Sequence, residues 1–228
     1  MITHLAQLFV ANSCYGCESP LTIQERYICL NCLSQMQETQ YHRKISENEL
    51  YYRLAGRIPL DGAMSLYFFS KSGRLQKILQ HLKYKGAPRL GVFLGQYYGF
   101  MLRGEAWLNE VQAIVPVPLH PTRLIQRGYN QAAQIAQGLS LALELPLETQ
   151  LLRRTRKTLT QTKKSGGNRW ENVSGAFELK KTPPKGILLV DDVITTGATL
   201  EACIRALTQS DSPPSKIYIA SIGMAQKG

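Results

Sequence analysis

A short segment near the C-terminus carries acidic, hydroxyl and glycine residues in an order that suits a phosphorylated sugar. Asp191 and Asp192 are neighbours, and three threonines and Gly197 follow within the range 195–199. Two adjacent carboxylates can accept hydrogen bonds from the vicinal hydroxyls of a sugar, or hold Mg²⁺ directly or through water. Threonine hydroxyls donate to phosphate, and a glycine lets the backbone approach it closely. The segment therefore predicts a site for a sugar phosphate, with the diol at one end and the phosphate at the other.

The elements around this segment predict that it lies at the edge of a sheet. The range 186–190 is apolar, begins with glycine and is too short for a helix, which indicates a buried parallel strand. The range 200–207 predicts a helix, whose first N–H groups are unpaired and attract phosphate. Ligands of open α/β sheets bind outside the carboxyl ends of the strands. A P-loop is excluded, because no Gly-Lys-Ser/Thr follows the strand.

Four of the five cysteines form two Cys-x2-Cys pairs separated by eleven residues. They are Cys14, Cys17, Cys29 and Cys32. Such pairs place four thiolates at the corners of a tetrahedron, the geometry of a structural zinc site without an open position for catalysis. So short a module has little core, and metal binding would supply most of its folding free energy. A redox pair and a lost metal are the alternatives, while Cys203 is expected to serve packing.

A second strand–loop–helix unit precedes the first. The range 113–118 predicts a buried strand that leaves the sheet at its prolines, and the range 132–143 predicts a helix. The loop between them should therefore lie beside the loop 195–199 in the sheet. Further strands are predicted at 63–69 and 216–222, further helices at 75–82 and 90–102, and a linker within 33–60.

The charge of the chain is strongly positive and unevenly placed. The net charge is +11, and the ranges 62–104 and 149–170 contain basic residues but no acid. Such blocks predict a surface that attracts polyanions. The positive charge either provides solubility and a pocket for a polyphosphate, or forms a surface that binds nucleic acid. Five tyrosines offer either stacking surfaces or packing, namely Tyr51, Tyr52, Tyr84, Tyr97 and Tyr98. No signal peptide and no transmembrane segment is predicted, so a cytoplasmic location is expected.

The segment 186–199 resembles the phosphoribosyl-pyrophosphate (PRPP) binding motif of type I phosphoribosyltransferases. The resemblance implies an α/β fold of that type with a central, mostly parallel sheet. It also implies that Asp191 and Asp192 contact the ribose diol of PRPP, which binds together with Mg²⁺. The residues implied to wrap the 5-phosphate are Thr195, Thr196, Gly197, Ala198 and Thr199.

Several separated motifs are similar, in the same order, to those of the ComF family, which is linked to bacterial competence for DNA uptake. Together with the cysteines and the PRPP motif, they are the ranges 115–120, 127–131, 152–154 and 172–177 and the residues Arg123, Thr158, Gln161 and Arg169. The first of these ranges also resembles the pyrophosphate loop of glutamine amidophosphoribosyltransferases. Leu119 replaces the acid of that loop, however, and the glutaminase domain of those enzymes is absent.

By this resemblance, the loop after the second strand binds the pyrophosphate of PRPP. Leu119 and His120 lie in that loop, and the guanidinium groups of Arg123 and Arg127 suit bidentate binding of a diphosphate. The basic range 153–168 corresponds to the mobile loop that closes over PRPP in this fold, or else follows a nucleic-acid backbone. The residues expected to take part in catalysis are Asp191, Asp192 and Arg127.

The predicted organisation is a four-cysteine zinc module over residues 1–45 and a phosphoribosyltransferase-like domain over 46–228. Two functions follow from the resemblance. The first is a PRPP-binding protein that acts in DNA uptake, handling single-stranded DNA together with competence-machinery proteins. The second is an active pentosyltransferase of nucleotide metabolism without a DNA role. No base-recognition pattern is visible in the sequence, so the acceptor of such an enzyme is not predicted.

Overall fold

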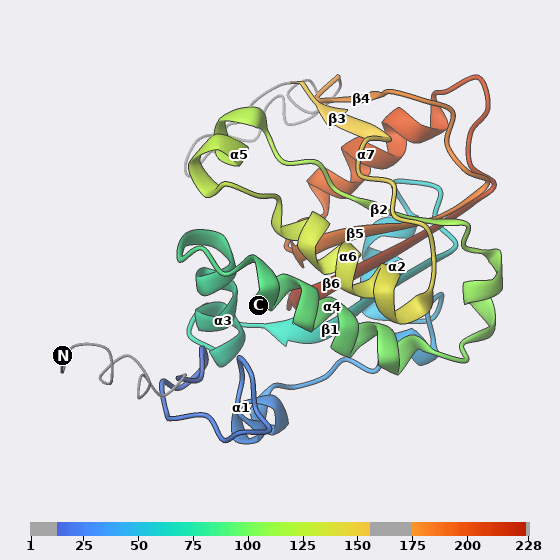
Figure 1. The fold of residues 1–228 in the computed structure, drawn as a ribbon. Coiled ribbons are helices and arrows are strands. Elements are labelled where there is room, and N and C mark those ends of the chain that lie inside the picture. The colour runs from blue at the N-terminus through green and yellow to red at the C-terminus, as the bar shows by residue number, and fades with distance from the viewer. Residues whose placement is uncertain (1–12, 156–174, 227–228) are drawn as a thin grey trace, which may run out of the picture.

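The computed structural model describes residues 13–155 and 175–226, which form an α/β fold around a parallel sheet (Figure 1). Four strands lie in the order β1-β6-β5-β2, and every neighbouring pair is parallel. The strands are β1 (Gly62–Phe69), β2 (Ala113–Pro116), β5 (Gly186–Ile194) and β6 (Lys216–Ala225). The predicted α/β class with a parallel central sheet is thereby confirmed.

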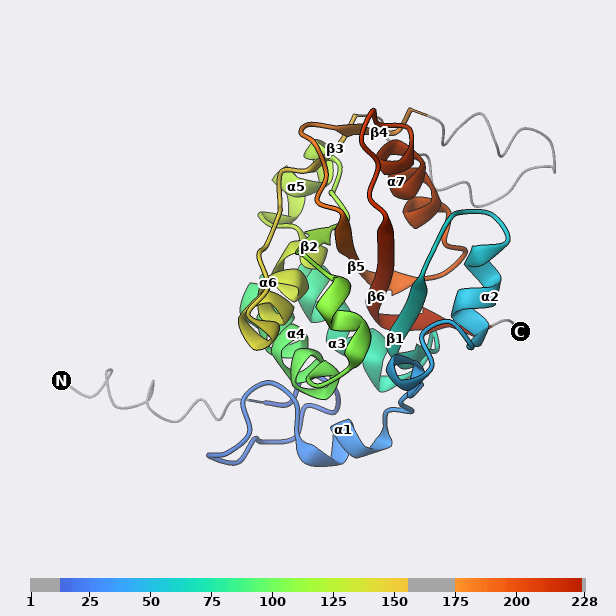
Figure 2. The same ribbon diagram turned by 90° about the vertical axis from the view of Figure 1, so that its right-hand side faces the viewer.

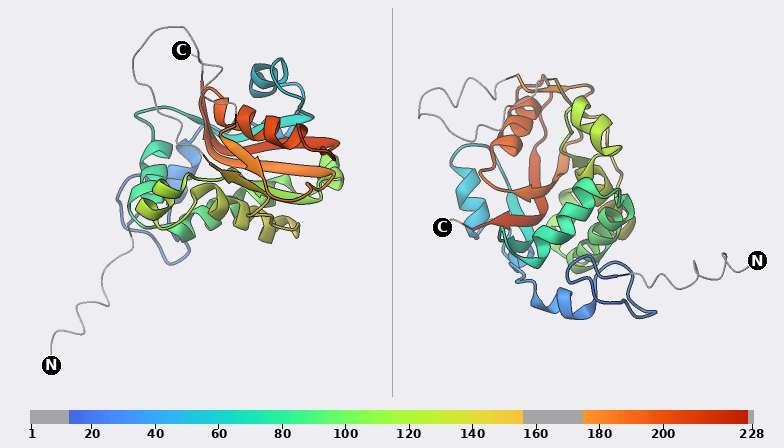
Figure 3. Two further views of the ribbon diagram at one scale, coloured as in Figure 1. Left: turned by 90° about the horizontal axis from the view of Figure 1, so that it is seen from above. Right: turned by 90° about the vertical axis from the view of Figure 1, so that its left-hand side faces the viewer.

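Helices cover both faces of the sheet, as Figure 3 shows in the view from above. One face carries α3 (Arg74–Tyr84), α4 (Pro88–Leu102) and α6 (Gln131–Leu143), and the other carries α2 (Glu49–Ala55) and α7 (Ala198–Thr208). Side chains of a strand alternate between the faces, so β5 contributes to both halves of the core. Leu188 and Val190 pack with α3, α4 and α6, whereas Ile187 and Leu189 pack with α2 and α7.

Shorter elements complete the described part of the chain. They are α1 (Leu30–Gln35), α5 (Pro121–Arg127), two 3-10 helices (Tyr41–Arg43 and Ala106–Glu110), and the strands β3 (Leu152–Arg154) and β4 (Phe177–Leu179). β3 and β4 pair antiparallel in a small second sheet beside α7. Figures 1 and 2 show α1 and the cysteine segment at the opposite end of the molecule from α7.

The predicted linker contains a helix, α2, that the sequence analysis missed. The Asn48 side chain accepts a hydrogen bond from the N–H of Tyr51 at 2.9 Å, which caps the start of this helix. Leu50 and Leu54 are fully buried and anchor α2 on the sheet. Its seven residues present only these two core positions, which is too short a pattern for helical periodicity to stand out.

The predicted loop after β2 also contains a helix, α5. His120 accepts a hydrogen bond from the N–H of Thr122 at 3.2 Å, and Pro121 occupies the first helical turn, where a missing N–H costs nothing. None of the residues of α5 is buried, so its sequence lacks the apolar stripe by which helices are predicted.

Candidate functional site

Asp191 and Asp192 both lie within strand β5, because β5 stays paired with β6 beyond Val190. β6 pairs with β5 as far as Ile194, so the strand is longer than the predicted range 186–190. The pairing of β5 with β2 ends at Val190, which leaves Asp191 and Asp192 beyond the end of β2. Successive side chains of a strand point to opposite faces, and the two carboxylates therefore lie on different sides of the sheet.

Asp192 lies on the side of α3 and forms an ion pair with the last turn of that helix. The Nζ atom of Lys83 lies 2.9 Å from Oδ2 of Asp192, and the two side chains are 25% and 15% exposed. The other carboxylate oxygen accepts a hydrogen bond from the N–H of Val193 at 2.7 Å. The pair thus lies at the rim of the sheet within reach of solvent, where a ligand hydroxyl could compete with the ammonium group.

Asp191 lies on the other side, toward α7 and the β3–β4 pair. Burial and the negative charge of Asp192 raise the pKa of its carboxyl group to about 7, although the positive charges of Lys83 and Arg154 act in the opposite direction. One carboxylate oxygen accepts a hydrogen bond from the N–H of Asp192 at 2.8 Å. This carboxyl group therefore titrates near neutral pH.

The loop between β5 and α7 borders a hollow at the same rim. The hollow is lined by Asp191 and by residues 193–200. Gly197 adopts a φ of +82°, and a Cβ atom added to it would lie 2.4 Å from Cδ2 of Leu54, so a larger residue would displace the loop. The rim site (Asp191, Asp192, Lys83 and residues 195–199) thus combines carboxylates, an ammonium group and hydroxyls. Asp191 and the loop line the hollow, whereas Asp192 and Lys83 lie on the other side of the sheet.

Two arginines from α2 and the residues just after it hold this loop from behind. Nη1 of Arg53 lies 3.3 Å from the carbonyl oxygen of Thr195, and Nη2 of Arg57 lies 3.0 Å from that of Thr196. Nη1 of Arg57 also contacts Glu201 in the first turn of α7, at 3.2 Å. The sequence analysis missed both arginines. The sequence holds one signal for them, a four-residue spacing that would place both on one face of a helix, although α2 ends before Arg57.

The loop after β2 lies next to the loop after β5, as the sequence predicts. The N–H of Val117 donates to the carbonyl oxygen of Val190 at 2.8 Å. Asn130 donates from Nδ2 to the carbonyl oxygen of Val117 at 2.9 Å, which closes the segment between β2 and α6. Leu119 and His120 are half-buried in this segment, and His120 is occupied in capping α5.

Arg127 lies at the end of α5 and is turned toward α3. Its Nη1 donates to Oε1 of Gln131 at 2.8 Å, and its guanidinium group lies 5.1 Å from the ring centroid of Tyr84. Tyr84 follows Lys83 in the chain, so Arg127 lies on the α3 side of the rim site. Among the described residues, Arg127 has these contacts and no ion pair with a carboxylate.

Arg123 lies one helical turn before Arg127 and on the side of β3. Burial lowers the pKa of Arg154, and the positive charge of Arg123 lowers it further, so the two guanidinium groups are close enough to repel. Arg154 also lies over the ring of Phe177, 5.3 Å from its centroid. The predicted basic loop starts here, but its residues 156–168 lie outside the described part of the chain.

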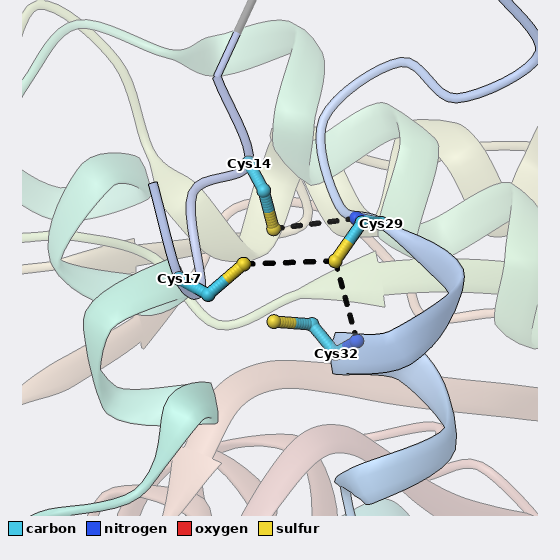
Figure 4. A group of neighbouring side chains, drawn as sticks. All are labelled: Cys14, Cys17, Cys29 and Cys32. Carbon is cyan, nitrogen blue, oxygen red and sulfur yellow. Dashed lines mark hydrogen bonds between the residues drawn. The ribbon is translucent and has the colours of Figure 1, made fainter. Parts of the chain in front are cut away.

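The four predicted cysteines lie together at the N-terminal end of the described chain, as Figure 4 shows. Their Sγ atoms all lie within 4.8 Å of one another, those of Cys17 and Cys29 are 3.7 Å apart, and all four thiols are free. Four sulfur atoms at about 2.3 Å from a tetrahedral zinc are about 3.8 Å apart. The cluster therefore has the dimensions to hold a zinc ion.

Hydrogen-bond donors surround these sulfur atoms. The N–H groups of Gly16 and Cys29 both donate to Sγ of Cys14 at 3.3 Å, and the N–H of Cys32 donates to Sγ of Cys29 at 3.4 Å. Nη1 of Arg74, in the first turn of α3, lies 3.7 Å from Sγ of Cys32. Such donors and a nearby cation act toward the thiolate, the form in which cysteine binds metal, whereas burial raises the pKa of Cys29 and Cys32 in the absence of a metal.

Comparison with known proteins finds relatives but no matching family model. The chain is 28% identical to competence protein F of Haemophilus influenzae over 207 residues, which cover 85% of the chain and 90% of that protein. It is 26% identical to competence protein ComFC of Bacillus subtilis over 200 residues, covering 86% and 78%. It is 35% identical to the DNA utilization protein YhgH of Escherichia coli K12 over 118 residues, about half of each chain. Among the described residues, no helix has the length and apolar character needed to cross a membrane.

Proposed function

Because this chain belongs to the ComF family of competence proteins, we propose that its rim site binds PRPP and that the protein acts in DNA uptake. The observation that carries the PRPP proposal is the hydroxyl-rich loop around a hollow that Asp191 also lines. The 5-phosphate would lie in the loop 195–199, and the ribose diol would contact Asp191 and Asp192. This assignment follows the predicted roles of these residues.

The proposed ligand would replace the contact between Lys83 and Asp192 when it enters the rim site. A ribose hydroxyl that donates to Asp192 takes the place of the Lys83 ammonium group, which lies 2.9 Å from the carboxylate in the unliganded arrangement. The released ammonium group is then available to the diphosphate, next to Arg127 at the end of α5. Three cations from two helices, Lys83 of α3 and Arg123 and Arg127 of α5, would thus flank the place of the diphosphate.

Transfer of the phosphoribosyl group is the second candidate function, and this set of cations favours it. In such a reaction the bond between C1 and the pyrophosphate oxygen breaks, and the electron pair leaves with pyrophosphate while an acceptor bonds to C1 and gives up a proton. Mg²⁺ bound together with PRPP would neutralise part of the diphosphate charge. Lys83, Arg123 and Arg127 would stabilise the charge that develops on the leaving group, which requires no protein nucleophile.

Thermal unfolding with Mg·PRPP tests the proposed binding. We expect PRPP to raise the Tm of the unmutated protein, since a ligand that binds only the folded state stabilises it. The double substitution Asp191→Asn and Asp192→Asn should abolish the shift, whereas Asp211→Asn, at an exposed site away from the rim, should keep it. An unmutated protein whose Tm does not respond to Mg·PRPP would contradict the proposal. Product analysis with nucleobase and amine acceptors then tests for transfer.

We propose that the four-cysteine cluster binds one structural zinc ion. The residues that would hold it are Cys14, Cys17, Cys29 and Cys32, and their spacing in the structure supports a single tetrahedral site. With four protein ligands the ion has no open position, so its contribution would be to the folding of the module.

We further propose that single-stranded DNA contacts the face formed by α5 and the end of α3. The ring of Tyr84 is exposed (71%), with the Arg127 guanidinium group beside it, and Ile125 is exposed as well. An aromatic ring next to a guanidinium group suits stacking of bases near a phosphate. Of the two alternatives for Tyr98, stacking or packing, the structure supports packing, because its side chain is fully buried in the core.

Binding of a labelled oligonucleotide at several salt concentrations tests this proposal. We expect the affinity to fall steeply with salt, as counterion release requires. Tyr84→Ala should weaken binding by about tenfold, the loss of one stacked base. Tyr52→Ala is the matched control, since Tyr52 is similarly exposed on the opposite face of the sheet. Equal affinities of the two variants would remove this face as the site of contact.

A further inference from the structure

The loop 195–199 owes its orientation to contacts on the side away from the hollow. The carbonyl oxygens of Thr195 and Thr196 accept hydrogen bonds from Arg53 and Arg57, at 3.3 Å and 3.0 Å. In a trans peptide the C=O and N–H groups point in opposite directions, and no peptide bond in the described chain is cis. The N–H groups of Thr196 and Gly197 therefore point away from the two arginines.

These N–H groups point toward the side on which an anion would bind. The hollow is lined by Asp191 and residues 193–200, and no residue of α2 contributes to its lining. Figure 2 shows α2 beside β1 at the edge of the sheet, below α7, which agrees with arginine contacts to the back of the loop. Two successive N–H groups that face one concave surface make a small site for anions.

The arginines are themselves firmly held. The Arg53 side chain is only 8% exposed, and its Nη1 also donates to the carbonyl oxygen of Ala225 at 2.8 Å, which ties the loop to the end of β6. Nη2 of Arg57 donates to the Arg53 carbonyl oxygen at 3.2 Å as well as to Thr196. Each guanidinium group thus joins two parts of the backbone, and neither can leave the loop without breaking a second contact.

Arg57 has a second effect on an incoming phosphate. Glu201 lies in the first turn of α7, where its negative charge would repel an anion. Its two carboxylate oxygens contact Arg57 at 3.2 Å and Arg205 at 3.0 Å. Arg57 therefore neutralises this acid and at the same time orients the Thr196–Gly197 peptide.

We propose that Arg57, supported by Arg53, is a positioning residue for the 5-phosphate: it fixes the Thr195 and Thr196 carbonyl groups so that the next two N–H groups face the ligand. This inference rests on the proposed PRPP site and adds residues that are outside its motif. Arg57 does not touch the ligand. It acts through the peptide bonds of the loop, and its effect is confined to ligands that carry a sugar 5-phosphate.

Calorimetric titration of the full chain with ribose 5-phosphate and, separately, with pyrophosphate tests the inference. We expect Arg57→Gln to raise the dissociation constant for ribose 5-phosphate at least about tenfold, because two oriented donors are lost. Its affinity for pyrophosphate should stay unchanged, since that ligand binds at the other loop. Arg205→Gln is the matched control: it removes the other partner of Glu201 but not the hydrogen bonds to the loop, so it should weaken ribose 5-phosphate binding much less than Arg57→Gln and leave the affinity for pyrophosphate unchanged.

A spectroscopic measurement on the unmutated protein gives a second readout. The amide signals of Thr196 and Gly197 should shift strongly when ribose 5-phosphate is added, and the shifts should be lost in Arg57→Gln. Unmutated protein that binds neither ribose 5-phosphate nor PRPP would overturn the proposed function, and the inference with it. If the unmutated protein binds but Arg57→Gln matches Arg205→Gln, or if Arg57→Gln loses pyrophosphate as well, the inference alone is overturned.

Discussion

The cysteine module and the rim site gather their functional groups in different ways. All four sulfur atoms of the cluster come from residues 14–32, and the turns that orient them are formed by the same short segment. The rim site depends on groups from five segments of the chain. They are the segment just after α2 with Arg57, the end of α3 with Lys83, α5 with Arg127, β3 with Arg154, and β5 with the loop that follows it.

The cysteine module and the rim site also differ in how far their functional groups are buried. Three of the four cysteines are buried, and they share one hydrophobic core with α3 and α4, where Tyr15 stacks on His81 at 4.2 Å. At the rim site, by contrast, polar groups are partly exposed and charged, and each carboxylate has only a few partners. A metal bound to the module would therefore act on stability, whereas a ligand at the rim would act on groups already held by a stable fold.

Removal of the metal ligand should produce the largest effect of any change considered. Cys29→Ser keeps the hydrogen bond that caps α1, because serine is also a good N-cap, but it removes one thiolate from the cluster. We expect the purified protein to lose its zinc and its free energy of unfolding to fall by several kcal/mol, on the order of half the stability of a typical domain. Metal analysis and thermal unfolding measure both quantities.

A buried cysteine on the other side of the sheet provides the control. Cys203 is fully buried among the residues that pack with α2 and α7, far from the cluster in sequence. Cys203→Ala should cost some packing but keep one zinc ion per chain. If Cys29→Ser retained its zinc and its Tm, the cluster would not be a metal site, and the contrast between the two regions would disappear.

A substitution in the loop after β5 tests whether the rim site depends on a remote segment. Gly197→Ala would place a Cβ atom 2.4 Å from Cδ2 of Leu54 at a φ of +82°. We expect the loop to shift off α2 and the affinity for ribose 5-phosphate to fall by about ten- to a hundredfold, measured by calorimetric titration. Gly104→Ala carries the same backbone strain at +87° with nothing within 4 Å, and it should leave the affinity unchanged.

The same contrast explains what the sequence could predict. The cysteine spacing was sufficient for the cluster, because its geometry is local and four sulfur atoms leave few alternatives. The four strands were predictable from short apolar runs, and the loop after β5 from its order of acids, threonines and glycine. Pairing of β2 with β5 then brought the two predicted loops together, which the sequence implied through the parallel order.

The parts that the sequence did not predict depend on contacts between distant residues. Arg57 and Thr196 are 139 residues apart, and no local pattern links them. The ion pair of Lys83 with Asp192 also joins residues that are far apart in the sequence, and no local pattern links them. The carboxylates of Asp191 and Asp192 were expected to act as a pair, but the extension of β5 along β6 sends them to opposite faces.

The surroundings of Asp191 also lead to a pH dependence of stability. The pKa of Asp191 is about 7 in the folded protein and near 3.8 without burial and the charge of Asp192. The folded state thus holds the proton more tightly, so unfolding releases it between about pH 4 and pH 7. The free energy of unfolding should fall as the pH rises through that window, by at most about 1.4 kcal/mol per pH unit.

Denaturant unfolding between pH 4 and pH 9 measures this dependence. The contribution of Asp191 is the difference in the free energy of unfolding between the unmutated protein and Asp191→Asn at each pH. Lys83→Met should extend the fall above pH 7, because the lysine charge lowers the pKa of Asp191 and its loss lets that pKa rise. Lys77→Met, at an exposed position of the same helix, should reproduce the unmutated profile. Identical profiles for the two lysine variants would mean that the charge of Lys83 does not reach Asp191. The rim site would then consist of two carboxylates that act independently on the two faces of the sheet.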